Sequence, residues 1–329
     1  MRRWVLVLVC TACAPGPPTY APAATAHPPF DPDALLADTA ALLEVPRVLG
    51  AADRSRGLEV LEQRLAQAGA TVHVQSFTGF DPLDGTPMPL SNLFGVVRPD
   101  APRQFVLATH FDIRPWAESD PDPAWRAHPI PGANDGTSGV VVLLALLPRL
   151  ADALPDDVGF TVVLFDGEEL GRPKHGGYCA GSTHFADHPN LSPPSVLRAS
   201  FGIVLDMVGD AELRIAKEAH STQQNPALVN KIWSVAAGLG ERSFIDATYP
   251  RAILDDHVFL SRAGIPSVLL IDYDYEPWHT HADALDRVSG ESLATVATVV
   301  FETVLSAMPP SPPASGDPGH TPRRSAEIR

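Results

Sequence analysis

Apolar residues recur along this chain in two spacings that predict different secondary structures. A spacing of three or four positions is typical of helices and occurs over residues 33–45, 53–68, 136–150, 226–239, 256–263 and 290–308. Short runs of β-branched and apolar residues predict strands over residues 71–77, 91–97, 104–109, 158–165, 199–208 and 266–271. Because strands and helices alternate, we predict an α/β fold in a single domain. Its mainly parallel, mixed central sheet has helices on both faces, and its first two strands form an antiparallel edge.

The strand predicted over residues 158–165 ends in a pair of glutamates. It runs into Asp166-Gly167-Glu168-Glu169, and a buried strand that ends in this way delivers carboxylates to the edge where α/β proteins place their sites. Adjacent side chains diverge, so one glutamate can bind a metal while its neighbour faces a substrate as an acid or base. A solvated glutamate pair that opens a loop is the alternative for this motif taken alone.

Other predicted strands lead to residues of the same chemical kind. His110 follows the strand over residues 104–109, Asp206 lies near the end of the strand over 199–208, and His279 follows the strand over 266–271. Asp135 closes the loop before the helix over residues 136–150. Carboxylates and neutral imidazoles are zinc ligands, and a zinc site with an open position is catalytic. For Asp135 alone, a helix N-cap is the alternative.

Composition and charge narrow the class of protein. A chain of 329 residues with 45% hydrophobic residues can bury one large α/β core, and no second domain is required. The formal net charge of -15, with no Lys/Arg cluster outside the extreme termini, excludes nucleic acid as a partner because its phosphates would be repelled.

The N-terminal segment is typical of an exported protein. Residues 1–13 combine basic Met1-Arg2-Arg3 with an apolar run too short to span a bilayer, and they predict a signal peptide. Small residues before Cys13 resemble a bacterial lipoprotein cleavage site, which predicts a periplasmic or cell-envelope protein that contacts the membrane only through a lipid on Cys13. Ordinary signal cleavage near the same place is the alternative.

The rest of the chain divides into three segments. We interpret residues 14–32 as a Pro/Ala-rich tether, residues 33–308 as a zinc-dependent catalytic domain and residues 309–329 as a disordered tail. The cysteines are Cys10, Cys13 and Cys179, so the exported chain has no disulfide framework. The hydrophobic core must therefore stabilise the domain.

Five motifs, taken in order, resemble those of the zinc aminopeptidase superfamily. They cover about residues 105–283 and comprise His110-x-Asp112, the segment 132–139, the segment 166–169, the segment 205–209 and His279-Thr280. Within that superfamily the chain looks most like the bacterial glutaminyl-peptide cyclotransferases, or glutaminyl cyclases. The features that point to them are Leu254-Asp255-Asp256-His257, Trp278 directly before His279, and the segment 112–117 that opens a long loop.

The resemblance implies cyclisation of an N-terminal glutamine of a peptide or protein to pyroglutamate, with release of ammonia. It implies one zinc ion held by Asp135, Glu169 and His279. Glu168 would transfer a proton, and Trp278 would form a wall of the glutamine pocket. Asp206 and Asp255 would form a hydrogen-bonded acidic network beside Glu168. A core position is the alternative for Trp278, and a helix N-cap is the alternative for Asp255.

Two other functions remain open at this point. The aminopeptidases of the same superfamily bind two zinc ions, and the residues that would bind the second ion, His110 and Asp206, are also in this sequence. In that case Asp135 would bridge the ions and Glu168 would activate a water molecule. An exported zinc-binding module without catalysis is the more remote alternative. His281 is a second candidate ligand beside His279, although the motif register favours His279. His257 is expected to make a structural hydrogen bond.

Overall fold

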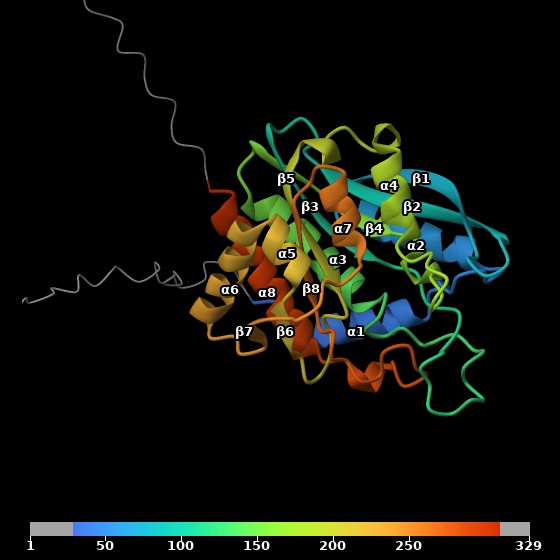
Figure 1. Ribbon diagram of the computed structural model, residues 1–329. Coiled ribbons are helices and arrows are strands. Elements are labelled where there is room, and N and C mark those ends of the chain that lie inside the picture. The colour runs from blue at the N-terminus through green and yellow to red at the C-terminus, as the bar shows by residue number, and fades with distance from the viewer. Residues whose placement is uncertain (1–28, 310–329) are drawn as a thin grey trace, which may run out of the picture.

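The computed structural model describes residues 29–309, which form an α/β domain around one mixed sheet (Figure 1). The sheet has six strands in the order β1-β2-β4-β3-β5-β8. Their bounds are β1 (Thr71–Phe80), β2 (Pro87–Val97), β3 (Arg103–His110), β4 (Val158–Phe165), β5 (Ala199–Asp206) and β8 (Ser267–Ile271). β1 and β2 pair antiparallel, as β2 and β4 do, whereas β4, β3, β5 and β8 are parallel neighbours. The mainly parallel sheet with an antiparallel edge is therefore confirmed.

Helices cover both faces of the sheet, as the alternation of elements predicts. On β3, Phe105 and Leu107 point into the larger core, while Val106 and Ala108 point into the smaller one. The larger core packs against α1 (Pro32–Leu43), α2 (Arg54–Gln67), α3 (Ser138–Ala153), α6 (Pro226–Leu239) and α8 (Gly290–Ala307). The smaller core packs against α4 (Ala180–Asp187) and α7 (Asp256–Arg262).

Several short elements lie outside the predicted set. They are α4, α5 (Ala219–Gln224), a two-stranded parallel sheet of β6 (Ile215–Lys217) and β7 (Phe244–Thr248), and the 3-10 turns η1 (Glu168–Leu170), η2 (Pro189–Leu191), η3 (Val196–Arg198) and η4 (Leu285–Arg287). Elements of this length contain too few residues to establish an apolar period. β5 also ends earlier than predicted, at Asp206, because Met207 adopts a positive φ of 45° that a strand cannot continue.

The folded domain begins slightly before residue 33. Phe30 is buried between α3 and α8, with its ring 6.0 Å from that of Phe301 and the Arg149 guanidinium 3.8 Å above it. Asp31 is the N-cap of α1. Both residues fall in the segment that the sequence interpretation assigned to the tether. The predicted signal peptide, the rest of that tether and residues 310–329 lie outside the described residues.

Within residues 29–309, none of the helices combines the length and the apolar character needed to cross a bilayer.

Candidate active site

Three side chains from distant parts of the chain meet at the carboxyl edge of the sheet. Glu169 Oε1 lies 3.4 Å from His279 Nε2, and Asp135 Oδ2 lies 3.8 Å from the same nitrogen. Tetrahedral zinc with ligands at about 2.0–2.1 Å separates those ligands by roughly 3.4 Å. Asp135 Oδ2 is buried and has no hydrogen-bond partner, although buried polar atoms normally have one. The donor set and the orphaned oxygen therefore fit a bound metal ion.

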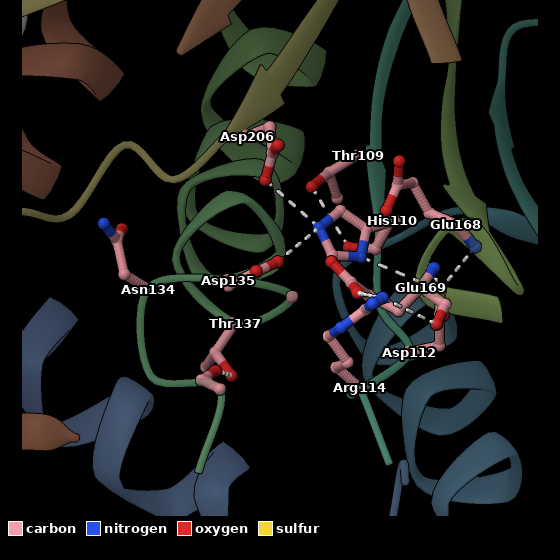
Figure 2. A network of polar contacts seen from close by, with 12 residues as sticks. Thr109, His110, Asp112, Arg114, Asn134, Asp135, Thr137, Glu168, Glu169 and Asp206 are labelled. Atoms are coloured by element: carbon pink, nitrogen blue, oxygen red, sulfur yellow. Dashed lines mark hydrogen bonds and ion pairs between the residues drawn. The ribbon is translucent and has the colours of Figure 1, made fainter. Parts of the chain in front are cut away.

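Glu168 and Glu169 are positioned by the turn that follows β4. Gly167, at φ 74°, turns the chain into η1, and a Cβ at this position would lie 2.7 Å from Leu90 Cδ1. The fully buried carboxylate of Asp112 accepts hydrogen bonds from the backbone N–H groups of Glu168 at 3.2 Å and Glu169 at 2.9 Å. The turn and Asp112 together fix the backbone positions of Glu168 and Glu169, from which the two carboxylate side chains extend. Asp112 is thus a supporting residue, as Figure 2 shows.

Asp135 is positioned by a loop rather than by a helix cap. α3 begins at Ser138 with Thr137 as its N-cap, so the N-cap interpretation of Asp135 is wrong. Its backbone N–H donates to the buried carboxylate of Asp283 at 3.2 Å. Buried Arg47 donates to the Gly136 carbonyl at 2.5 Å and to Thr137 Oγ1 at 2.6 Å. These contacts leave the Asp135 side chain directed into the site.

His279 is oriented by Glu118, a residue absent from the predicted site. His279 Nδ1 donates to Glu118 Oε1 at 2.8 Å, which directs Nε2 towards Glu169 and Asp135. A carboxylate in this place fixes the tautomer of a metal-binding histidine and raises its basicity. Burial raises the pKa of Glu118, but the hydrogen bonds from His279 and Arg114 outweigh it and lower that pKa.

Arg114 links the same two carboxylates. Its guanidinium is fully buried, donates to Glu169 Oε2 at 2.7 Å and forms an ion pair with Glu118. Glu169 therefore has one oxygen engaged by Arg114 and the other free to face His279. The sequence placed Arg114 within a family signature but assigned it no role. Its spacing of four residues from Glu118 is the only local signal for this pair.

Glu168 is buried beside the cluster, with a thiol as its hydrogen-bond donor. Cys179 Sγ lies 3.3 Å from Glu168 Oε1. Burial, followed by the charge of Glu169, raises the pKa of Glu168 well above its usual value. A carboxyl group with a raised pKa can exchange a proton near neutral pH, as an acid–base residue must.

Asp206 points to His110, and Figure 2 shows both with Asp135. His110 Nε2 lies 3.1 Å from Asp206 Oδ1 and 3.2 Å from Asp135 Oδ1. Burial lowers the pKa of His110, but the neighbouring carboxylates of Asp112, Asp135 and Asp206 raise that pKa well above its usual value. Ligand atoms of His110, Asp135 and Glu169 also lie within 4.8 Å of one another, so His110 remains close enough to take part in metal binding.

Asp255 is the N-cap of α7, which confirms the alternative interpretation of this residue. Its carboxylate accepts a hydrogen bond from the Asp256 backbone N–H at 2.5 Å. Within residues 29–309 there is no direct hydrogen bond among Glu168, Asp206 and Asp255, so the predicted network is absent in that form. The three carboxylates nevertheless line one cavity. Burial, followed by the charges of Asp206 and Asp256, raises the pKa of Asp255 well above its usual value.

The cavity that these three carboxylates line has a volume of about 300 Å³ and both polar and apolar walls. Trp278 is 39% exposed and stacks on the His279 ring at 3.6 Å, so its interpretation as a core residue is wrong. The cavity is lined by the candidate acid–base and metal-binding residues together with Trp278 and residues of the segment before α7. Its lining comprises Glu168, Glu169, Tyr178, Asp206, Met207, Ala252, Ile253, Leu254, Asp255, Ile271, Tyr273, Trp278 and His279.

The two other histidines that the sequence singled out lie elsewhere. His281 stacks on Trp125 with ring centroids 3.8 Å apart. His257 is buried and its Nε2 lies 3.2 Å from Glu218, which confirms the expected structural hydrogen bond. These positions make His279 the C-terminal histidine of the site.

Fold and site together are those of an α/β enzyme with a candidate metal centre. Residues 92–304 match peptidase family M28, and the chain belongs to this family. It is 27% identical over 252 residues to an aminopeptidase of Bacillus subtilis and 26% identical over 245 residues to the glutaminyl-peptide cyclotransferase of Bos taurus. These matches cover 74% and 64% of this chain, but only 48% and 64% of the two relatives.

A solved structure of a glutaminyl cyclase resembles nearly the whole domain. The crystal structure of the Bacteroides thetaiotaomicron enzyme bound to N-acetylhistamine superposes with a TM-score of 0.78 and 31% sequence identity. The superposition covers 84% of this chain and 98% of that one. The single-domain fold is therefore shared with a glutaminyl cyclase over nearly that enzyme's full length.

Proposed function

We propose that this protein cyclises the N-terminal glutamine of peptides or proteins to pyroglutamate and releases ammonia. The observation that carries the proposal is the meeting of Asp135, Glu169 and His279 beside a cavity that Glu168, Glu169, His279 and Trp278 line. The likeness to solved and curated glutaminyl cyclases supports the same reaction. A cavity of about 300 Å³ suits one terminal residue better than an extended peptide.

Asp135, Glu169 and His279 are proposed to hold one Zn²⁺. When bound, zinc supplies Lewis-acid polarisation of the substrate's γ-carbonyl group. Glu118 and Arg114 hold His279 and Glu169 in the orientation that this requires. The remaining work of the protein is to fold the substrate and exclude water, because nucleophile and carbonyl belong to the same residue.

Glu168 is the proposed proton carrier. The free α-amine attacks the γ-carbonyl carbon, a C–N bond closes the five-membered lactam, and the bond to the side-chain amide nitrogen breaks. Glu168 takes the proton that the α-amine loses and returns it to the leaving nitrogen, which departs as ammonia. The raised pKa of Glu168 suits both transfers. Asp206 and Asp255 line the same cavity, and the proximity of Asp255 contributes to the raised pKa of Glu168.

Aminopeptidase activity is the second candidate, and one observation favours it. His110 Nε2 lies within hydrogen-bond distance of both Asp206 Oδ1 and Asp135 Oδ1. They are the residues that would bind a second zinc ion. In that reaction Glu168 would activate water rather than an amine, and the product would be a free amino acid.

The ammonia assay separates these functions. Purified protein with zinc is expected to release ammonia from Gln-initiated peptides, to release no amino acid from Leu-initiated peptides, and to contain about one zinc per chain. Free leucine and two zinc ions per chain would establish the aminopeptidase. If neither ammonia nor leucine is released, the non-catalytic zinc-binding module is the remaining interpretation. Glu168→Gln should abolish turnover with bound zinc nearly unchanged, whereas Glu169→Gln should lose the zinc.

We also propose that the chain is exported to the periplasm or cell envelope and carries a lipid on Cys13. The support is the basic and apolar segment at residues 1–13 and the small residues before Cys13. A Cys13→Ala protein is expected to move from the membrane fraction to the soluble exported fraction. An unchanged distribution would indicate ordinary signal cleavage without a lipid.

A further inference from the structure

A second cavity lies directly beside the one that holds the candidate metal site. It has a volume of about 240 Å³ and is formed by β6, β7, the segment after β7 and the end of β8. Ile253, Ile271 and Tyr273 line both cavities. Tyr273 is 41% exposed, so the wall common to the two cavities reaches the protein surface. A ligand that fills the first cavity therefore has this second cavity as its neighbour.

Most of the residues that line the second cavity are apolar or aromatic. Ile245, Ala247 and Ile253 contribute apolar surface, and the rings of Tyr249 and Tyr273 meet edge to face with their centroids 5.0 Å apart. Of the metal-ligating cluster found within residues 29–309 (His110, Asp135 and Glu169), Glu169 lines the first cavity and no member lines the second. This second cavity is thus suited to binding rather than to a reaction.

The charged groups of the second cavity do not favour a charged ligand. Glu218 is the buried one, and it already accepts hydrogen bonds from the backbone N–H groups of His220, Ser221 and Ile253, at 2.7, 2.6 and 3.1 Å. The other two lining charges, Arg214 and Asp274, are of opposite sign. An apolar side chain fits these walls better than an acidic or basic one.

The size of the cavity matches a single large side chain. An apolar cavity of roughly 150 Å³ holds one benzene molecule, so about 240 Å³ admits an aromatic side chain. An extended peptide advances about 3.3 Å per residue, and the side chain that follows a terminal residue in the first cavity is therefore within reach of the wall at Tyr273.

We propose that the second cavity is a subsite for the peptide residues that follow the N-terminal glutamine, and that it selects an aromatic or large apolar side chain. This inference rests on the proposed cyclase function and specifies its substrate class. Burial of one such side chain against the Tyr249–Tyr273 wall is expected to raise kcat/KM by about tenfold over a peptide with glycine in that place.

The test compares the amides of Gln-Phe-Gly, Gln-Gly-Phe and Gln-Gly-Gly by ammonia release. The wild-type protein should favour at least one phenylalanine peptide over Gln-Gly-Gly by about tenfold in kcat/KM. Ala247→Phe fills the cavity from its own wall and should bring that ratio close to one. Ala237→Phe introduces the same side chain at an exposed position of α6, away from both cavities, and should preserve the ratio.

Each remaining outcome decides against the inference. A wild-type ratio near one, or a tenfold ratio that survives in Ala247→Phe, overturns the subsite while ammonia release still supports the cyclase. Absence of ammonia from all three peptides overturns the cyclase function and the subsite with it.

If Ala247→Phe does not fold, as judged by its unfolding transition, Tyr249→Ser removes an aromatic wall instead and should lower the ratio at least threefold.

Discussion

Replacement of Glu118 by glutamine tests whether the loop carboxylate prepares His279 for a metal. Glu118→Gln keeps an oxygen that can accept from His279 Nδ1 but removes the negative charge at 2.8 Å from that nitrogen. It also removes one of the two carboxylates that share buried Arg114, which leaves the guanidinium bound to Glu169 alone. Both changes should weaken zinc binding, the first by making His279 less basic and the second by drawing Glu169 towards Arg114.

The expected size of this effect follows from the exposure of Glu118. Loss of the hydrogen-bonded partner of a metal ligand lowers metal affinity by about 10–100-fold. The Glu118 side chain is 27% exposed, so solvent screens part of its charge and the lower end applies. We expect a loss of about tenfold, or roughly 1.4 kcal/mol of binding free energy.

Competition with a chromogenic zinc chelator at neutral pH measures this affinity. Glu59→Gln, which neutralises an exposed glutamate of α2 far from the site, serves as the matched control and should bind zinc as the wild type does. If Glu118→Gln retains zinc within twofold of the control, the proposed orientation of His279 by Glu118 is refuted.

Three further outcomes are expected. Cys179→Ala removes the thiol donor to Glu168 and should lower kcat about fivefold, the equivalent of roughly 1 kcal/mol, with zinc affinity unchanged; equal kcat would contradict it. Arg54→Met leaves Asp166 buried and unpaired and should cost about 3–5 kcal/mol in urea unfolding, part of which Asp166→Asn in the same chain restores. Hydrogen bonds lower the pKa of Glu218 to about 2, so its contribution to stability is complete above its ordinary value of 4.5 and declines as the pH falls towards 2. The difference in unfolding free energy between wild type and Glu218→Gln should shrink over that range, and a constant difference would exclude this linkage.

The sequence predicted those parts of the fold and site that follow from periodic patterns. Parallel strands end at a common edge, so their polar C-terminal residues had to approach one another, and His110, Glu168 and Asp206 do so. The roles of Asp135 and His279 came from the family resemblance, because the loops that carry them have no period that fixes their path. Elements as short as β6 were missed for the same reason, although β6 helps to form the second cavity.

The supporting residues were less accessible to sequence reasoning because their partners are distant in the chain. Arg47 is 89 residues from Gly136, whose carbonyl it contacts, and Glu118 is 161 residues from His279. A buried arginine or a loop glutamate has no pattern that names such a partner. These residues nevertheless decide which atom each candidate ligand presents, since Arg114 engages one oxygen of Glu169 and Glu118 engages one nitrogen of His279. The motifs therefore point to the candidate ligands, while the loops between them determine the geometry in which a metal can be held.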